Sequence, residues 1–200
     1  MRSILCALVV LCVGSVMLWA GTDGLRAFTS EQARRLAVQN KSRPLPAAVL
    51  QDQNGVDFTL AEYRGTRLLI DFIYTRCRTI CGVLGADFRR LSGQIAERGP
   101  NGPVLLSISF DPDTDTPARL RAYADLYHAD GKRWRMARVA DKKALSAMLR
   151  TFEVVVIPDA LGEFQHNAAI HLVDEHGHLT RIFGYDEAEQ AGNSAVSIER

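Results

Sequence analysis

The 200-residue chain is organised around the stretch LLIDFIYTRCRTIC, residues 68–81. Its first part is apolar, β-branched and aromatic, which is typical of a buried strand, and a polar turn with two cysteines follows. If a helix begins at or near Cys77, the side chains of Cys77 and Cys81 lie on one helical face, with Cβ atoms about 5–6 Å apart. Two such thiolates can hold one soft metal ion or join as a disulfide. Ordinary core packing is the alternative, because cysteine is among the most buried residue types.

The composition is that of a globular protein, with 47% hydrophobic and 24% charged residues and a net charge of +1. A nucleic-acid surface needs a clustered excess of basic residues, so no nucleic-acid partner is expected. Of the 4 cysteines, Cys6 and Cys12 lie in the apolar N-terminal segment, where each is expected to serve as a small apolar residue. The remaining pair, Cys77 and Cys81, indicates a site and not a disulfide scaffold.

Residues 1–20 are predicted to be a transmembrane anchor or a signal peptide. Residues 4–20 carry no charge, and as a helix they would reach roughly 26 Å, barely enough for a thin bilayer. An uncleaved anchor is favoured, because the large Leu18 spoils a small-x-small cleavage site. Arg2 places the N-terminus in the cytoplasm. The remaining chain is then expected in the periplasm or an equivalent exported space, where disulfides persist.

Residues 21–46 are expected to form a stalk with a short helix, Glu31–Asn40, capped by Thr29 or Ser30. Residues 47–200 are expected to form one domain that starts with a hairpin around Asn54-Gly55. Further strands are expected at 67–74, 104–110, 132–140, 166–173 and 179–183, and helices at 81–98, 117–128, 141–152 and 186–200. This alternation predicts an α/β, thioredoxin-like fold, with a mixed central sheet flanked by helices and the cysteines where the first central strand meets its helix.

Three segments resemble the Sco/SenC family: DFIYTRCRTIC at residues 71–81, SISFDPDTDTP at residues 107–117, and a histidine entering a late strand. That histidine is His166, which precedes Gly177 of the late turn by eleven positions, as in the family. The similarity extends over roughly residues 46–200. It implies a membrane-anchored, thioredoxin-like copper protein that serves assembly of the binuclear copper centre of cytochrome c oxidase. By the same resemblance, copper would be bound by Cys77, Cys81 and His166.

The chain also departs from the family pattern. Arg78 and Gly82 stand where the family usually has proline after each cysteine, and Gln165 stands where an aspartate usually precedes the histidine. Arg78 should favour the charged form of the thiolates, and it adds positive charge beside a cation site. The missing aspartate removes one acceptor that could orient the imidazole. Asp111 matches an acidic position near the family's site.

The donor set alone leaves the metal open. Copper(I) suits two thiolates and an imidazole, and zinc accepts the same donors with an open fourth position. The exported compartment and the resemblance favour copper. His171 is the rival of His166 as a ligand, since it lies within the expected late strand. His128 is expected at a helix end, and His176 and His178 in a solvated turn.

Three aspartates also need an explanation. Asp111 and Asp115 precede Thr116-Pro117, where stabilising a turn and a helix start is a sufficient role for either. Asp71 interrupts an apolar strand, and a buried carboxylate requires a partner. Arg67, Arg76 or a backbone amide could supply it.

Two functions follow from these residues. The first is a metallochaperone, a binding protein more than an enzyme, which takes copper from donor proteins and passes it to a copper-accepting oxidase subunit. The second is a thiol–disulfide oxidoreductase, in which Cys77 attacks and Cys81 resolves, and for which His166 is dispensable. The three-residue spacer is longer than in ordinary Cys-x-x-Cys enzymes, which favours the first.

Overall fold

The structure is a computed structural model that describes residues 2–77, 80–97, 102–160 and 162–196, with the backbone alone at residues 80 and 81. Arg78 therefore lies outside the described residues, as does the side chain of Cys81. The chain divides into two compact units, Met1–Lys41 and Ser42–Arg200.

The first unit consists of two helices, α1 (Arg2–Gly21) and α2 (Ser30–Asn40). Helix α1 is long and apolar enough to cross a membrane, a criterion that an N-terminal signal sequence also meets. Helix α2 begins with a capping box, in which Thr29 accepts from the Gln32 amide and the Gln32 side chain accepts from the Thr29 amide. The predicted short helix and its Thr29 cap are thus confirmed.

The second unit is built on a mixed sheet. Within the described residues, eight strands pair in the order β1-β10-β9-β4-β5-β6-β2-β3, with β4, β5 and β6 parallel and the other pairs antiparallel. Their bounds are β1 Arg43–Pro44, β2 Val49–Asp52, β3 Asp57–Thr59, β4 Leu68–Ile73, β5 Val104–Ser109, β6 Trp134–Arg138, β9 Ala169–Val173 and β10 His178–Gly184. The predicted mixed central sheet is therefore present.

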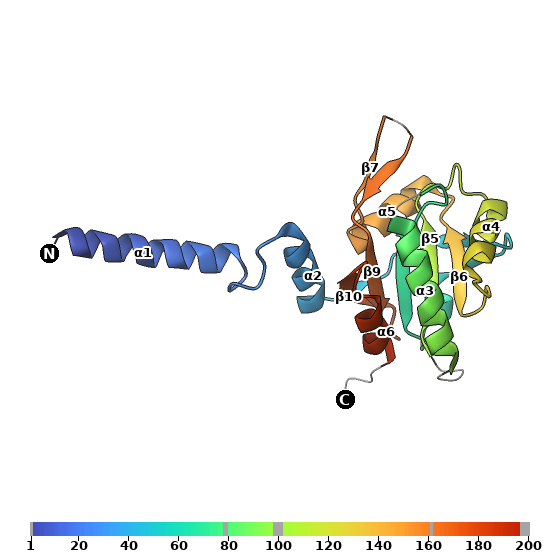
Figure 1. Ribbon diagram of the computed structural model, residues 1–200, viewed down its shortest axis with the longest axis horizontal. Helices are drawn as coiled ribbons and strands as arrows, with labels where there is room; N and C mark the ends of the chain where they lie inside the picture. Colours follow the sequence, from blue (N-terminus) through green and yellow to red (C-terminus); the bar gives the residue numbers. More distant parts are fainter. Residues whose placement is uncertain (1, 78–79, 98–101, 161, 197–200) are drawn as a thin grey trace. The chain divides into compact units, whose positions relative to one another are not determined.

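Helices cover both faces of this sheet. Helices α3 (Ile80–Glu97), α4 (Pro117–Tyr127) and α6 (Ala188–Val196) share one apolar cluster with the sheet, and α3 and α6 lie in front of the central strands in Figure 1. Helix α5 (Lys142–Phe152) packs on the other face, where the rings of Phe72 and Phe152 are 5.1 Å apart. Strand β4 is buried along its whole length. Burial on both faces explains why its sequence is nearly continuously apolar.

The described part of α3, Ile80–Glu97, agrees with the helix predicted at residues 81–98. The Cys77 amide donates to the Tyr74 carbonyl oxygen at 3.1 Å, so Cys77 itself lies in the turn after β4. Cys81 is the second residue of the described part of α3. The prediction that the two cysteine side chains share one helical face lies outside the described residues, which include neither residues 78–79 nor the side chain of Cys81.

One difference from the sequence prediction concerns His166. A single strand was expected at residues 166–173, but β7 (Val156–Pro158) and β8 (Phe164–His166) form a separate hairpin that extends beyond the sheet (Figure 1). Asn167 separates β8 from β9, because its side chain accepts from the Val155 amide and donates to the Glu153 carbonyl oxygen. His166 is thus the last residue of a hairpin strand.

Candidate metal site

The candidate site forms where β4 and β5 end. Carboxyl ends of parallel strands meet at one edge of a sheet, and the Phe110 amide after β5 donates to the Ile73 carbonyl oxygen at 3.0 Å. The turn after β4 carries Cys77, which is half-buried at this edge.

Two acidic residues after β5 bind this turn. Asp115 accepts hydrogen bonds from the Thr75 amide at 3.0 Å and from the Thr75 hydroxyl at 2.5 Å. Asp111 forms an ion pair with Arg76 at 3.0 Å. The sequence predicted turn-stabilising roles for Asp111 and Asp115 within their own loop. The structure adds contacts from both to the segment that precedes Cys77.

His166 reaches the same place from the hairpin. Its ring lies 5.1 Å from the ring of Phe110 and 6.4 Å from that of Tyr74. Both ring nitrogens are buried, and neither has a hydrogen-bond partner among the described residues. Burial lowers the pKa of His166, and the negative charge of a Cys77 thiolate acts in the opposite direction. The imidazole is therefore neutral near pH 7, and it lies close enough to Cys77 for the charge of the thiolate to act on it.

Tyr74 connects the end of β4 to the hairpin that carries His166, a role that the sequence did not reveal. Its hydroxyl donates to the Glu163 carboxylate at 2.9 Å and lies 3.3 Å from the Phe164 carbonyl oxygen, so it holds the hairpin to the end of β4. Burial and the bond to Glu163 raise the pKa of Tyr74, and the Cys77 side chain adds to this. The phenol thus remains a proton donor between the thiol and the hairpin.

The other histidines lie elsewhere. His171 packs between the rings of Phe72 and Phe152 on the α5 face, with Nδ1 3.2 Å from the Ile70 carbonyl oxygen. His176 lies in the turn before β10 and His178 is the first residue of β10, near the opposite end of β4, where the Gly65 amide donates to the Glu175 carbonyl oxygen. His128 ends α4 in a left-handed conformation. Among the described histidines, His166 alone is brought to Cys77.

Of the partners that the sequence suggested for Asp71, a backbone amide, its own, does bond to the carboxylate, but the two arginines do not. Arg67 pairs with Glu175 and Arg76 with Asp111, whereas Asp71 is hydrogen-bonded to Ser107 on β5. Burial raises the pKa of Asp71 to about 7, although the Ser107 bond acts in the opposite direction. Its Oδ1 has no hydrogen-bond partner among the described residues. This side chain lies on the sheet face covered by α3.

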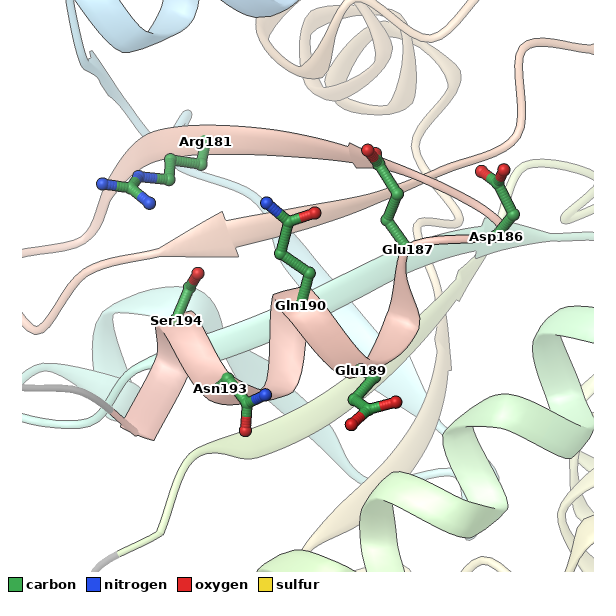
Figure 2. A pocket seen from close by; sticks show the side chains of 7 residues that line it. All are labelled: Arg181, Asp186, Glu187, Glu189, Gln190, Asn193 and Ser194. Carbon is green, nitrogen blue, oxygen red and sulfur yellow. The ribbon is translucent and has the colours of Figure 1, made fainter.

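Two cavities of the second unit have no lining residue at Cys77 or His166. One of about 590 Å³ lies between β10 and α6 and is lined by polar side chains such as Arg181, Glu187 and Gln190 (Figure 2). Another of about 570 Å³ is lined by residues 44–49 and by the turn of residues 176–178. Neither contains a residue that the sequence proposed as a ligand.

The donors present at the site fit a soft metal ion. Cys77 offers one sulfur, and His166 offers a neutral imidazole whose two nitrogens have no hydrogen-bond partner among the described residues. Among the described side chains, no group of three or more His, Cys, Asp or Glu is arranged to hold a metal ion, and the Cys81 side chain is not one of those described.

Comparison with known proteins identifies the relatives of this chain. The family model described as SCO1/SenC matches residues 41–198. The chain is 27% identical over 158 residues to the SCO1 protein homolog of Bacillus subtilis (strain 168), in an alignment that covers 74% of this chain and 81% of that protein.

Solved structures give the same result for the fold. BsSco, a member of the Sco family of cytochrome c oxidase assembly proteins, matches with a TM-score of 0.66 and 23% identity over 78% of this chain and 94% of that one. The structure of Bradyrhizobium japonicum ScoI with copper bound matches with a TM-score of 0.60 and 24% identity, over 76% and 97%. These likenesses confirm the expected thioredoxin-like α/β fold.

Proposed function

Because the chain belongs to the SCO1/SenC family, we propose that it binds copper and delivers it during assembly of cytochrome c oxidase. Two proteins of similar fold support this proposal: BsSco, which belongs to a family of cytochrome c oxidase assembly proteins, and Bradyrhizobium japonicum ScoI, whose structure has copper bound. Delivery requires a donor and an acceptor. The proposed partners are copper donor proteins and a copper-accepting oxidase subunit, with α1 as the membrane anchor and the second unit on the exported side.

The proposed ligands are Cys77, Cys81 and His166. The observation that carries this assignment is the buried imidazole of His166, whose two nitrogens have no hydrogen-bond partner among the described residues although it lies near Cys77. A buried polar group without a partner is costly, and a metal ion would satisfy one nitrogen. When bound, copper(I) supplies a soft acceptor for thiolate sulfur. The neutral imidazole can donate its lone pair without first losing a proton.

Copper titration of the full-length chain in detergent tests this function. The reduced protein should take up about one copper(I) ion per chain in competition with a chelator, because the donors form a single site. His166→Ala should weaken copper binding roughly tenfold or more. His176→Ala is the matched control, because His176 is exposed in a turn at the opposite end of β4. Equal copper binding by both variants would remove His166 from the ligand set.

A second function is thiol–disulfide exchange by Cys77 and Cys81. The observation that favours it is the position of Cys81 in the first turn of α3, where the helix N-terminus stabilises a thiolate. In this function Cys77 and Cys81 cycle between dithiol and disulfide, and His166 takes no part. Full oxidase assembly in cells that carry His166→Ala, together with loss of assembly in Cys77→Ser, would favour exchange over copper delivery.

A further inference from the structure

We propose that Asp115 is the positioning residue of Cys77: its buried carboxylate holds the turn after β4 and thereby fixes where the thiol stands relative to His166. This inference rests on the proposed function in so far as that thiol and imidazole bind the metal. It assigns to Asp115 a role beyond its own loop.

The hydrogen bonds of Asp115 carry the proposal. Its Oδ2 accepts from the Thr75 amide at 3.0 Å and from the Ser109 hydroxyl at 2.5 Å, and its Oδ1 accepts from the Thr75 hydroxyl at 2.5 Å. Ser109 in turn accepts from the Asp111 amide at 3.1 Å. The carboxylate therefore joins three segments: the end of β5, the loop before α4, and the turn that carries Cys77.

Stabilisation of its own loop does not explain this arrangement. Asp115 is fully buried, and it lies two residues before Pro117, the first residue of α4. The N-cap of that helix is Thr116, whose side chain accepts from the Arg119 amide, so Asp115 is not needed as the cap. Two of its three side-chain bonds go to Thr75, a residue 40 positions away in the chain. The carboxylate is thus used mainly to hold the cysteine turn.

The path from Thr75 to the thiol is short. Thr75 is two residues before Cys77, and the Cys77 amide is bonded to the Tyr74 carbonyl oxygen, so one tight turn contains both Thr75 and Cys77. Tyr74 also packs against His166, which approaches from the hairpin. Metal–ligand distances at a well-formed site lie within about 0.2 Å of their standard values. Release of Thr75 is therefore expected to disturb the Cys77–His166 geometry before it unfolds the domain.

Substitutions at both ends of the contact test the proposal. Asp115→Ala removes all three side-chain bonds, and Thr75→Val removes only the hydroxyl bond. Asp115→Asn can keep all three, because its oxygen can accept from the Thr75 amide and Ser109 while its amide group donates to the Thr75 hydroxyl. Asp52→Ala is the control, since Asp52 is another buried aspartate: it ends β2 and pairs with Arg135 on the neighbouring strand β6.

Three readouts are made on each full-length variant: copper(I) affinity, the thiolate-to-copper(II) charge-transfer spectrum, and the pH profile of Cys77 alkylation without metal in a Cys81→Ser background. Asp115→Ala should weaken copper binding roughly 10–100-fold and shift the spectrum, as loss of orienting partners does at other metal sites. Thr75→Val should show a smaller change of the same kind. Asp115→Asn and Asp52→Ala should keep the wild-type spectrum and alkylation profile, even where Asp52→Ala lowers stability.

Two results would overturn the positioning role. One is an Asp115→Ala protein with wild-type affinity, spectrum and alkylation profile. The other is an Asp115→Asn protein as impaired as Asp115→Ala, because charge and not the bonds to Thr75 would then matter. If the wild-type chain binds no copper while Asp115→Ala still alters Cys77 alkylation, the proposed function fails and the positioning role stands.

Discussion

The Tyr74 hydroxyl donates a 2.9 Å hydrogen bond to the Glu163 carboxylate, and this bond joins the end of β4 to the hairpin that carries His166. The rings of Tyr74 and Phe164 are 5.2 Å apart in an edge-to-face contact, which strengthens the same junction. The position of the imidazole relative to Cys77 therefore depends on a contact between side chains that are far apart in the sequence.

Tyr74→Phe should lower the free energy of unfolding by about 1–2 kcal/mol, because a hydrogen bond to a charged acceptor is lost. Chemical denaturation of the full-length chain measures this loss. A double-mutant cycle with Glu163→Ala should give a coupling of about 1 kcal/mol, since the two side chains share one bond. Tyr185→Phe, which changes an exposed tyrosine, is the control. Strictly additive effects of the two substitutions would show that the bond does not contribute.

Asp71→Asn should change how stability depends on pH. The pKa of Asp71 is raised from 3.8 to about 7, so the folded protein retains a proton that the unfolded chain loses. The wild-type protein should therefore lose stability from this group as the pH rises from about 4 to about 7, by on the order of 4 kcal/mol. Asparagine does not titrate, so the stability of the variant relative to the wild type should rise over this pH range.

Denaturation at about pH 4, 6 and 8 measures this difference, with the exposed Asp57→Asn as control. If the difference in free energy of unfolding between the wild type and Asp71→Asn stays constant with pH, Asp71 titrates normally.

Copper(I) should stabilise the folded protein by mass action. At a free concentration about 100 times the dissociation constant, it should add about 2.7 kcal/mol to the free energy of unfolding. Thermal denaturation of the reduced full-length chain, with and without copper, measures this gain, and a strong chelator should reverse it. His166→Ala should lose most of the gain and His176→Ala should keep it. A gain that survives in His166→Ala would mean that copper stabilises through other residues.

Two glycines of α3 should respond oppositely to alanine. A Cβ at Gly85 would come within 2.6 Å of the Tyr127 ring on α4, whereas a Cβ at Gly93 would meet nothing within 4 Å. Gly85→Ala should therefore destabilise the protein by about 1–3 kcal/mol through overpacking. Gly93→Ala should stabilise it by about 0.5–1 kcal/mol, because alanine favours the helix. Denaturation curves measure both. Stabilisation by Gly85→Ala would mean that α3 and α4 pack less closely than described.

Much of the fold was predictable because its signals are local. The apolar run of residues 68–73 predicts a strand buried on both faces, and Thr116-Pro117 predicts the start of α4. Asn54-Gly55 predicts the β2–β3 hairpin, in which Gly55 has a φ of 77°. Each of these patterns depends on neighbours within a few residues.

The details of the site depend on contacts between distant residues, and local patterns do not encode them. The bonds from Tyr74 to Glu163 and from Asp71 to Ser107 join different strands. The bonds from Asp115 to Thr75 likewise join two separate loops. The strand predicted at residues 166–173 includes His166, because the break at Asn167 comes from its contacts with residues 153 and 155 and not from the local pattern.

The hairpin β7–β8 lies outside the eight-stranded sheet, whereas the turn that holds Cys77 is bonded to the sheet's own strand ends. An ion bound by both would therefore act as a reversible cross-link that closes a long loop of the chain, with the entropic effect of a disulfide. Transfer of the ion to an acceptor would remove that cross-link, and the β7–β8 hairpin would then be less constrained. An acceptor protein could thus distinguish the metal-loaded chain from the empty one by the rigidity of the β7–β8 hairpin.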